Sequence, residues 1–179
     1  MIYIIKLILF SYLLSLTDNF LNFGKMVDIV SNFYAKLYRK DDLKTWNLPP
    51  NMEEQLDLNT YEYFFLVSNI EKSSEDKHVH FSIYPINENT VHLFQIHAQK
   101  IVPQLLTRAL IIIKEAGFNI ISSTGFCTDA TNCYFGVFTS IDCEFELEPV
   151  ILELGYLEQV QDVKVFDFSS KGCSEFTPE

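Results

Sequence analysis

Apolar and polar positions along this chain fall into short blocks of two kinds. Runs rich in β-branched and aromatic residues, bounded by turn-forming residues, predict strands. Apolar positions that recur every three or four residues predict helices. From residue 33 onward, these blocks predict a mixed α+β chain in which strands outnumber helices.

The region 26–88 predicts a small β-rich module of about 55 ordered residues, which is too small to be stable without a partner. The helix in it is expected to begin at Pro49 or Pro50, because proline is tolerated in a helix only at its opening. The expected strands are 33–38 ("FYAKLY"), 43–48 ("LKTWNL"), 61–70 ("YEYFFLVSNI") and 78–86 ("HVHFSIYPI").

The segment "LPPNMEEQLDLNTYEYFFL" carries a family resemblance. An apolar-proline pair, three core positions of a helix and two of the next strand match at Leu48, Pro49, Met52, Leu56, Leu58, Phe64 and Leu66. Over about residues 30–86, the chain resembles the AbrB/MazE/SpoVT swapped-hairpin family. The resemblance implies an intertwined dimer, and it implies DNA contact through the basic residues Arg39, Lys40 and Lys44.

The region 89–168 predicts a second module. Strands are expected at 90–98, 118–126, 133–141 and 160–168, and helices at 103–117 and 148–155. This β-α-β-β-α-β order is that of a ferredoxin-like domain, in which both helices cover one face of an antiparallel sheet. The first helix is expected to bury Leu106, Ala109, Leu110 and Ile113.

The motif "EAGFNI", with Gly117 and Asn119, and the later "VQDVKVF" give this second module its own resemblance. From about residue 90 to 168, it is similar to the ACT domain, a regulatory module that pairs its sheets and often binds amino acids between protomers. The resemblance implies a ligand site at Gln99, Gln104 and Asn119.

The net charge of the chain bears on whether it can bind DNA. The chain has 13 Lys and Arg residues against 24 Asp and Glu residues, a formal net charge of -11. Such a field repels phosphate backbones unless basic residues gather on one face, so it disfavours DNA as a partner.

The two ends of the chain are expected to lie outside the modules. Residues 1–25 are apolar but too short for a membrane-spanning helix, and they make a poor signal peptide. We interpret them as a dispensable extension of a cytoplasmic protein, with a membrane tether as the alternative. Residues 169–179 are expected to form a flexible tail.

Enzymatic chemistry has little support in the sequence. Cys127 and Cys133 flank the loop "CTDATN", and we interpret them as the two ends of a hairpin that carries a pair of free thiols. His78 and His80 alternate on one strand and are expected to be exposed. No nucleophile motif, phosphate-binding loop or metal-ligand pattern is present, so we expect no catalytic residue, no metal and no cofactor.

These observations lead to one functional hypothesis and one alternative. The hypothesis is a non-enzymatic, homodimeric regulatory protein whose ACT-like domain senses an amino acid or another small metabolite, coupled to an AbrB-like module for dimerisation or DNA binding. The alternative is a dimeric adaptor that binds proteins and has no small-molecule ligand.

Overall fold

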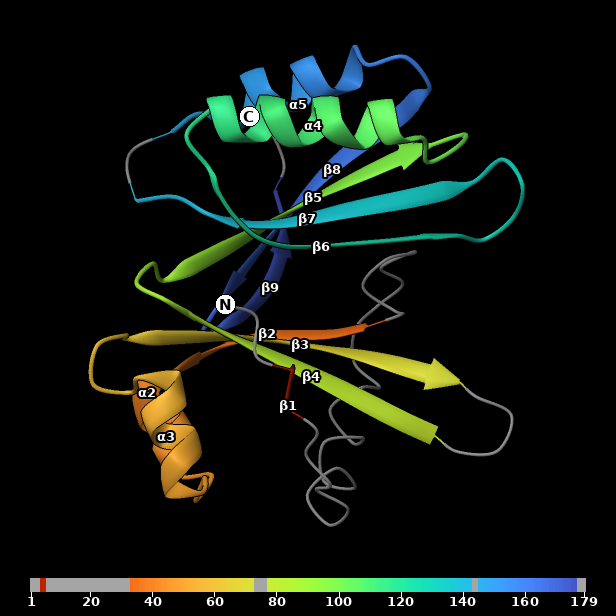
Figure 1. Cartoon of the computed structure of the whole chain (residues 1–179). Helices are drawn as coiled ribbons and strands as arrows, with labels where there is room; N and C mark the ends of the chain where they lie inside the picture. Colours follow the sequence, from red (N-terminus) through yellow and green to blue (C-terminus); the bar gives the residue numbers. More distant parts are fainter. Residues whose placement is uncertain (1–3, 6–32, 73–76, 143–144, 177–179) are drawn as a thin grey trace. The chain divides into compact units, whose positions relative to one another are not determined.

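The computed structural model describes residues 4–5, 33–72, 77–142 and 145–176 (Figure 1). The expected extension at 1–25 therefore lies outside the described residues, except for Ile4–Ile5. The protein is a mixed α+β chain of two compact units. One unit contains the described part of 1–35 together with Leu66–Ile83, and the other contains Lys36–Phe65 and Tyr84–Glu179. Among the described residues, no helix has the length and apolar character needed to cross a membrane.

The second unit contains a five-stranded sheet with the strand order β6-β7-β5-β8-β9. All four pairings in this sheet are antiparallel. Its elements in chain order are β5 (Thr90–Ala98), α4 (Pro103–Glu115), β6 (Asn119–Cys127), β7 (Cys133–Ser140), α5 (Leu147–Gly155), β8 (Val160–Ser169) and β9 (Gly172–Glu175). The strands and helices that the sequence predicts between residues 90 and 168 are all present.

The core of this unit lies between the sheet and its two helices. Helices α4 and α5 lie side by side on one face of the five-stranded sheet (Figure 1). Helix α4 buries Leu105, Ala109, Ile112 and Ile113 against it. The predicted burial of Ala109 and Ile113 is confirmed, whereas Leu106 and Leu110 are only partly buried against the same core. The apolar run of α4 contains two overlapping stripes with helical spacing, so spacing alone does not select between them.

The opposite face of the sheet is covered in part by Phe65, which is fully buried. The Phe65 ring centroid lies 5.2 Å from that of Phe138 on β7 and 5.7 Å from that of Phe168 on β8. Tilted and edge-to-face rings at such distances contribute beyond the burial of their area. The segment Lys36–Phe65 therefore belongs to the second unit, whereas the sequence predicts two consecutive modules with a boundary near residue 88.

A second sheet has the strand order β1-β4-β3-β2. Its elements, with two short helices, are β1 (Ile4–Ile5), β2 (Phe33–Arg39), α2 (Lys40–Lys44), α3 (Pro50–Leu56), β3 (Tyr63–Lys72) and β4 (Lys77–Ile86). The predicted helix after the two prolines is confirmed and buries Leu56.

The predicted strand at 43–48 was wrong, because its start lies in α2. The carboxylate of Asp42 accepts a hydrogen bond of 3.1 Å from the backbone N–H of Arg39 at the start of this helix. Leu43, which lies in α2, is buried, with only 1% of its surface exposed. The paired aspartates thus lie in the first turn of a helix.

The C-terminal segment also differs from the prediction of a flexible tail. Strand β9 pairs with β8, and Phe168 of β8 lies opposite Cys173 of β9. Gly172, at φ 141°, adopts a conformation that side chains disfavour, and this allows the tight turn before β9. Beyond β9, the N–H of Phe176 donates a hydrogen bond of 2.8 Å to the carbonyl of Val165. The segment up to Phe176 is therefore an ordered edge of the sheet.

Candidate functional site

A small hollow lies where β5 ends and α4 begins. Its volume is about 220 Å³. It is lined by Val102, Gln104, Leu105, Arg108, Leu157, Glu158 and Gln159, and we call it the β5–α4 hollow. The first four residues come from the loop and first turns of α4, and the last three come from the turn between α5 and β8.

The backbone around this hollow is held by one hydrogen bond between its two sides. The N–H of Gln99 donates to the carbonyl of Gln159 at 3.2 Å. Gln159 has φ 77°, in the left-handed region that is costly for residues other than glycine. A strained backbone at a candidate ligand site is a feature that often accompanies function.

The β5–α4 hollow combines side chains of opposite charge. Arg108 supplies a guanidinium group and Glu158 supplies a carboxylate, and among the described residues neither forms an ion pair. Helix α4 also contributes its first turn, where the Val102 side chain caps no N–H group. The N–H groups of Gln104 and Leu105 have no partner within the helix, since the first amides of any helix lack one.

These groups can act together on a small zwitterion. Arg108 and the first amides of α4 suit a carboxylate, because a guanidinium binds carboxylates with two parallel hydrogen bonds and a helix N-terminus favours negative charge. Glu158 suits an ammonium group. The hollow is smaller than the pockets of about 300–1,000 Å³ that hold drug-sized ligands, so it fits a smaller molecule.

Two of the three predicted ligand residues lie at this corner, and the third does not. Gln104 lines the β5–α4 hollow, and Gln99 is exposed and bonded to Gln159 beside it. Asn119 begins β6, beyond the opposite end of the 13-residue helix α4, which is about 20 Å long. Asn119 therefore does not join Gln99 and Gln104 in one site.

Sequence reasoning missed Arg108, Glu158 and Gln159. A signal for Arg108 was available, because Arg108 follows Gln104 by four residues and side chains with that spacing share a helix face. Glu158 and Gln159 carry no comparable signal. Their approach to α4 depends on the antiparallel return of α5, which brings Leu157 into the core beside α4.

The predicted nucleic-acid-binding cluster lies at the junction of β2 and α2. The ammonium group of Lys40 forms an ion pair with Glu62, and that of Lys44 lies 3.6 Å from a carboxylate oxygen of Asp41. Arg39 is exposed. Two of these three basic residues thus have an acidic neighbour that competes with phosphate.

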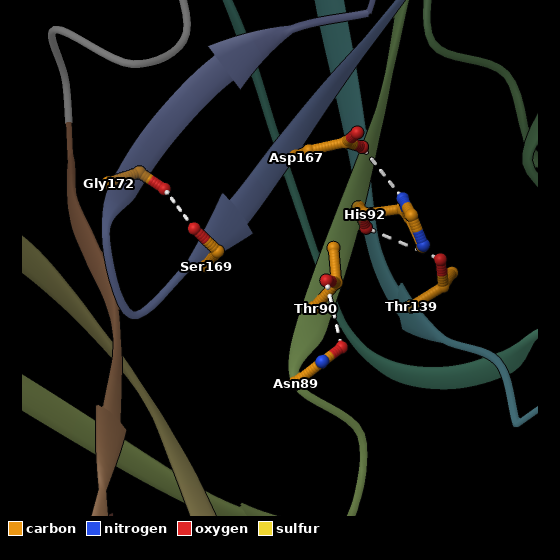
Figure 2. A network of polar contacts seen from close by, with 7 residues as sticks. All are labelled: Asn89, Thr90, His92, Thr139, Asp167, Ser169 and Gly172. Atoms are coloured by element: carbon orange, nitrogen blue, oxygen red, sulfur yellow. Dashed lines mark hydrogen bonds and ion pairs between the residues drawn. The ribbon is translucent and has the colours of Figure 1, made fainter.

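A buried polar pair occupies the helix-covered face of the sheet. Figure 2 shows His92 of β5 between Asp167 of β8 and Thr139 of β7. The Nδ1 atom of His92 lies 2.7 Å from Oδ1 of Asp167, and the Thr139 hydroxyl donates to the His92 backbone carbonyl at 3.3 Å. The His92 ring also meets the Phe145 ring edge to face, with centroids 4.9 Å apart. These contacts give the buried His92 ring a hydrogen-bond partner and link strands β5, β7 and β8.

The hairpin loop between β6 and β7 is closed by a disulfide between Cys127 and Cys133. The prediction of a hairpin is confirmed, whereas the prediction of two free thiols was wrong. The two cysteines oppose each other in the strand register, which brings their side chains together. Within the loop, the N–H of Thr131 donates to Asp129, and this bond is the main reason that the pKa of Asp129 lies below its ordinary value.

His78 and His80 are the two histidines that the sequence predicts to be exposed. His78 lies in β4, but its side chain is outside the described residues. His80 is half-buried, so the expectation of full exposure was wrong for it. His97 points to the face opposite His92, as their parity along β5 predicts, and stacks on Tyr134 with ring centroids 4.6 Å apart.

A larger depression, of about 1360 Å³, lies elsewhere in the second unit. It is lined by Tyr63, Asn87, Glu88, Asn89, Ile141, Asp142, Phe145 and Glu146. It is open to solvent, and its lining has three carboxylates and no basic group. The β5–α4 hollow is smaller, but its opposite charges give a ligand a defined orientation, so we favour it as the candidate site.

Metal chemistry finds no support around either hollow. In the part of the chain that the structure describes, no three His, Cys, Asp or Glu side chains are grouped so that they could hold a metal ion. The candidate site is therefore described by Arg108, Glu158 and the first turn of α4 alone, without a metal ion.

A scan against models of protein families finds no match to this chain, and a search of curated proteins finds none either.

Proposed function

We propose that this chain is a non-enzymatic regulatory protein that binds an amino acid, or a similar small zwitterion, in the β5–α4 hollow. The observation that carries this proposal is the presence of Arg108 and Glu158 in one small hollow, without ion pairs among the described residues. A zwitterion would use both charges at once. A ligand with only one charged group would contact only one of the two.

The proposed fold family supports the same conclusion. The strand order β6-β7-β5-β8, with two helices on one face, is the order of a ferredoxin-like domain. ACT domains are regulatory modules of this type, and the resemblance implies their ligand at the loop that follows the first strand. Gln99 and Gln104 flank that loop in this chain. We therefore propose an ACT-like domain at 89–168.

We do not include DNA binding in the proposed function. Lys40 and Lys44 lie next to Glu62 and Asp41, and the formal net charge of the chain is -11. A protein without a strong basic face gains little of the counterion release that drives DNA binding.

Thermal unfolding of the full chain in the presence of each of the common amino acids tests the proposal. A ligand that binds only the folded state raises the unfolding midpoint, and at a hundredfold excess over its Kd it adds about 2.7 kcal/mol to the free energy of unfolding. We expect one chemical class of amino acid to raise the midpoint. A flat panel would favour the adaptor without a small-molecule ligand.

A further inference from the structure

The outer side of the helical layer exposes three large apolar side chains. Ile111 of α4 is 48% exposed, Leu152 of α5 is 60% exposed, and Tyr156 at the end of α5 is 85% exposed. The helix faces that bear Ile112 and Leu154 are turned toward the sheet, so these three residues lie on the side away from it. Single exposed apolar residues are ordinary, but a group of them on adjacent helices marks an interaction surface.

The charges beside these residues differ between the two helices. Lys114 is exposed near the end of α4, next to Ile111 along the helix, although Glu115 follows it. Helix α5 contains Glu148 and Glu153 and no basic residue. Among the described residues, Lys114, Glu148 and Glu153 form no ion pair.

We infer that this surface, defined by Ile111, Lys114, Glu148, Leu152 and Tyr156 and here called the helical face, is a two-fold interface between two copies of this chain. In a two-fold interface the same patch meets itself, so α4 of one protomer lies over α5 of its partner. Each Lys114 then faces the acidic helix of the other protomer. A second copy thus matches both the apolar residues and the charges of the helical face.

The charges also argue against other occupants. A nucleic acid would meet Glu148 and Glu153, and a membrane surface rich in anionic lipids would meet the same carboxylates. The inference is independent of the ligand proposed for the β5–α4 hollow. The experiment therefore uses no ligand, and its variants leave Arg108 and Glu158 unchanged.

Sedimentation velocity of the full chain, from low to high micromolar concentration, is the test. We expect the wild type to be dimeric and Leu152→Glu to be monomeric, because the change buries a charge in the centre of the interface. Leu152 is mostly exposed within one protomer, so the variant should keep the circular dichroism spectrum and thermal midpoint of a folded protein. Ile120→Glu, which alters an exposed apolar residue on β6, is the matched control and should remain dimeric.

A charge exchange tests the pairing of α4 with α5 directly. Lys114→Glu and Glu148→Lys should each weaken the dimer by about tenfold, and the double variant should recover most of this loss. Lys171→Glu in the turn between β8 and β9 makes the same charge change as Lys114→Glu and should have no effect. A monomeric wild type at every concentration would overturn the inference. So would a dimer that Leu152→Glu leaves intact, or that Ile120→Glu disrupts equally.

Discussion

The N–H of Gln99 donates a hydrogen bond of 3.2 Å to the carbonyl oxygen of Gln159, and it joins the end of β5 to the turn before β8. This bond holds together the two chain segments that form the β5–α4 hollow. Gln159 accepts it from a left-handed backbone conformation, at φ 77°. The geometry of the candidate site is therefore maintained at a cost in local backbone energy.

Replacing Gln159 by glycine should relieve this cost. Glycine adopts positive φ without the clash that other residues suffer, so Gln159→Gly should raise the free energy of unfolding by about 1 kcal/mol. Chemical denaturation measures the change. Gln161→Gly, on the neighbouring strand β8, is the control and should lower the free energy of unfolding, because glycine weakens strand interiors. A loss of stability in Gln159→Gly would contradict the prediction.

The pair formed by His92 and Asp167 should contribute measurably to stability. Asp167→Ala leaves the buried Nδ1 donor of His92 without its acceptor, so the free energy of unfolding should fall by about 1–3 kcal/mol. Asp162→Ala, an exposed position on the same strand, should cost less than about 0.5 kcal/mol. Equal losses at the two positions in urea unfolding would show that the pair contributes nothing.

Reduction of the Cys127–Cys133 disulfide should destabilise the protein. The two cysteines are separated by six positions, and the loss of a cross-link that closes so short a loop costs about 2 kcal/mol. Urea unfolding with and without dithiothreitol measures this difference. The control is the double variant Cys127→Ala with Cys133→Ala, which should respond to dithiothreitol with no change. If the wild type were equally unresponsive, the disulfide would have no stabilising role.

The thiol of Cys173 should react slowly in the folded protein. Burial, with a smaller contribution from the charge of Asp167, raises its pKa from 9.0 to about 11. At pH 8 the thiolate should therefore be about a hundredfold rarer than in the unfolded chain. Because the folded pKa is the higher one, the associated stability is present below pH 9 and is lost as the pH rises toward 11. Iodoacetamide labelling of the Cys173 peptide, followed by mass spectrometry, would refute this if the folded and unfolded rates were equal.

The sequence predicted most elements of the second unit because their patterns are local. The run "TVHLFQIHA" becomes β5, and Pro103 marks the start of α4. The predicted strand at 43–48 was wrong because its start lies in the helix Lys40–Lys44, where the Asp42 carboxylate accepts a hydrogen bond from the N–H of Arg39. The C-terminal strand β9 was missed because its few residues form a strand only by pairing with β8.

The candidate site was predictable only in part. Gln99 and Gln104 are close in sequence, so one loop brings both to the same corner. Glu158 reaches that corner through the antiparallel return of α5, and His92 meets Asp167 across 75 positions of sequence. Contacts of this kind depend on the sheet order, which no local pattern specifies.

Binding of an amino acid by Arg108 is the central claim, and isothermal titration calorimetry tests it most directly. The titrant is the amino acid that gives the largest thermal shift, and the proteins are the wild type, Arg108→Gln and the control Lys171→Gln. Loss of a charged hydrogen-bonding partner for the carboxylate should weaken binding by about tenfold or more in Arg108→Gln. The control should bind as the wild type does. Equal affinity of the wild type and Arg108→Gln would contradict the claim that the β5–α4 hollow is the ligand site.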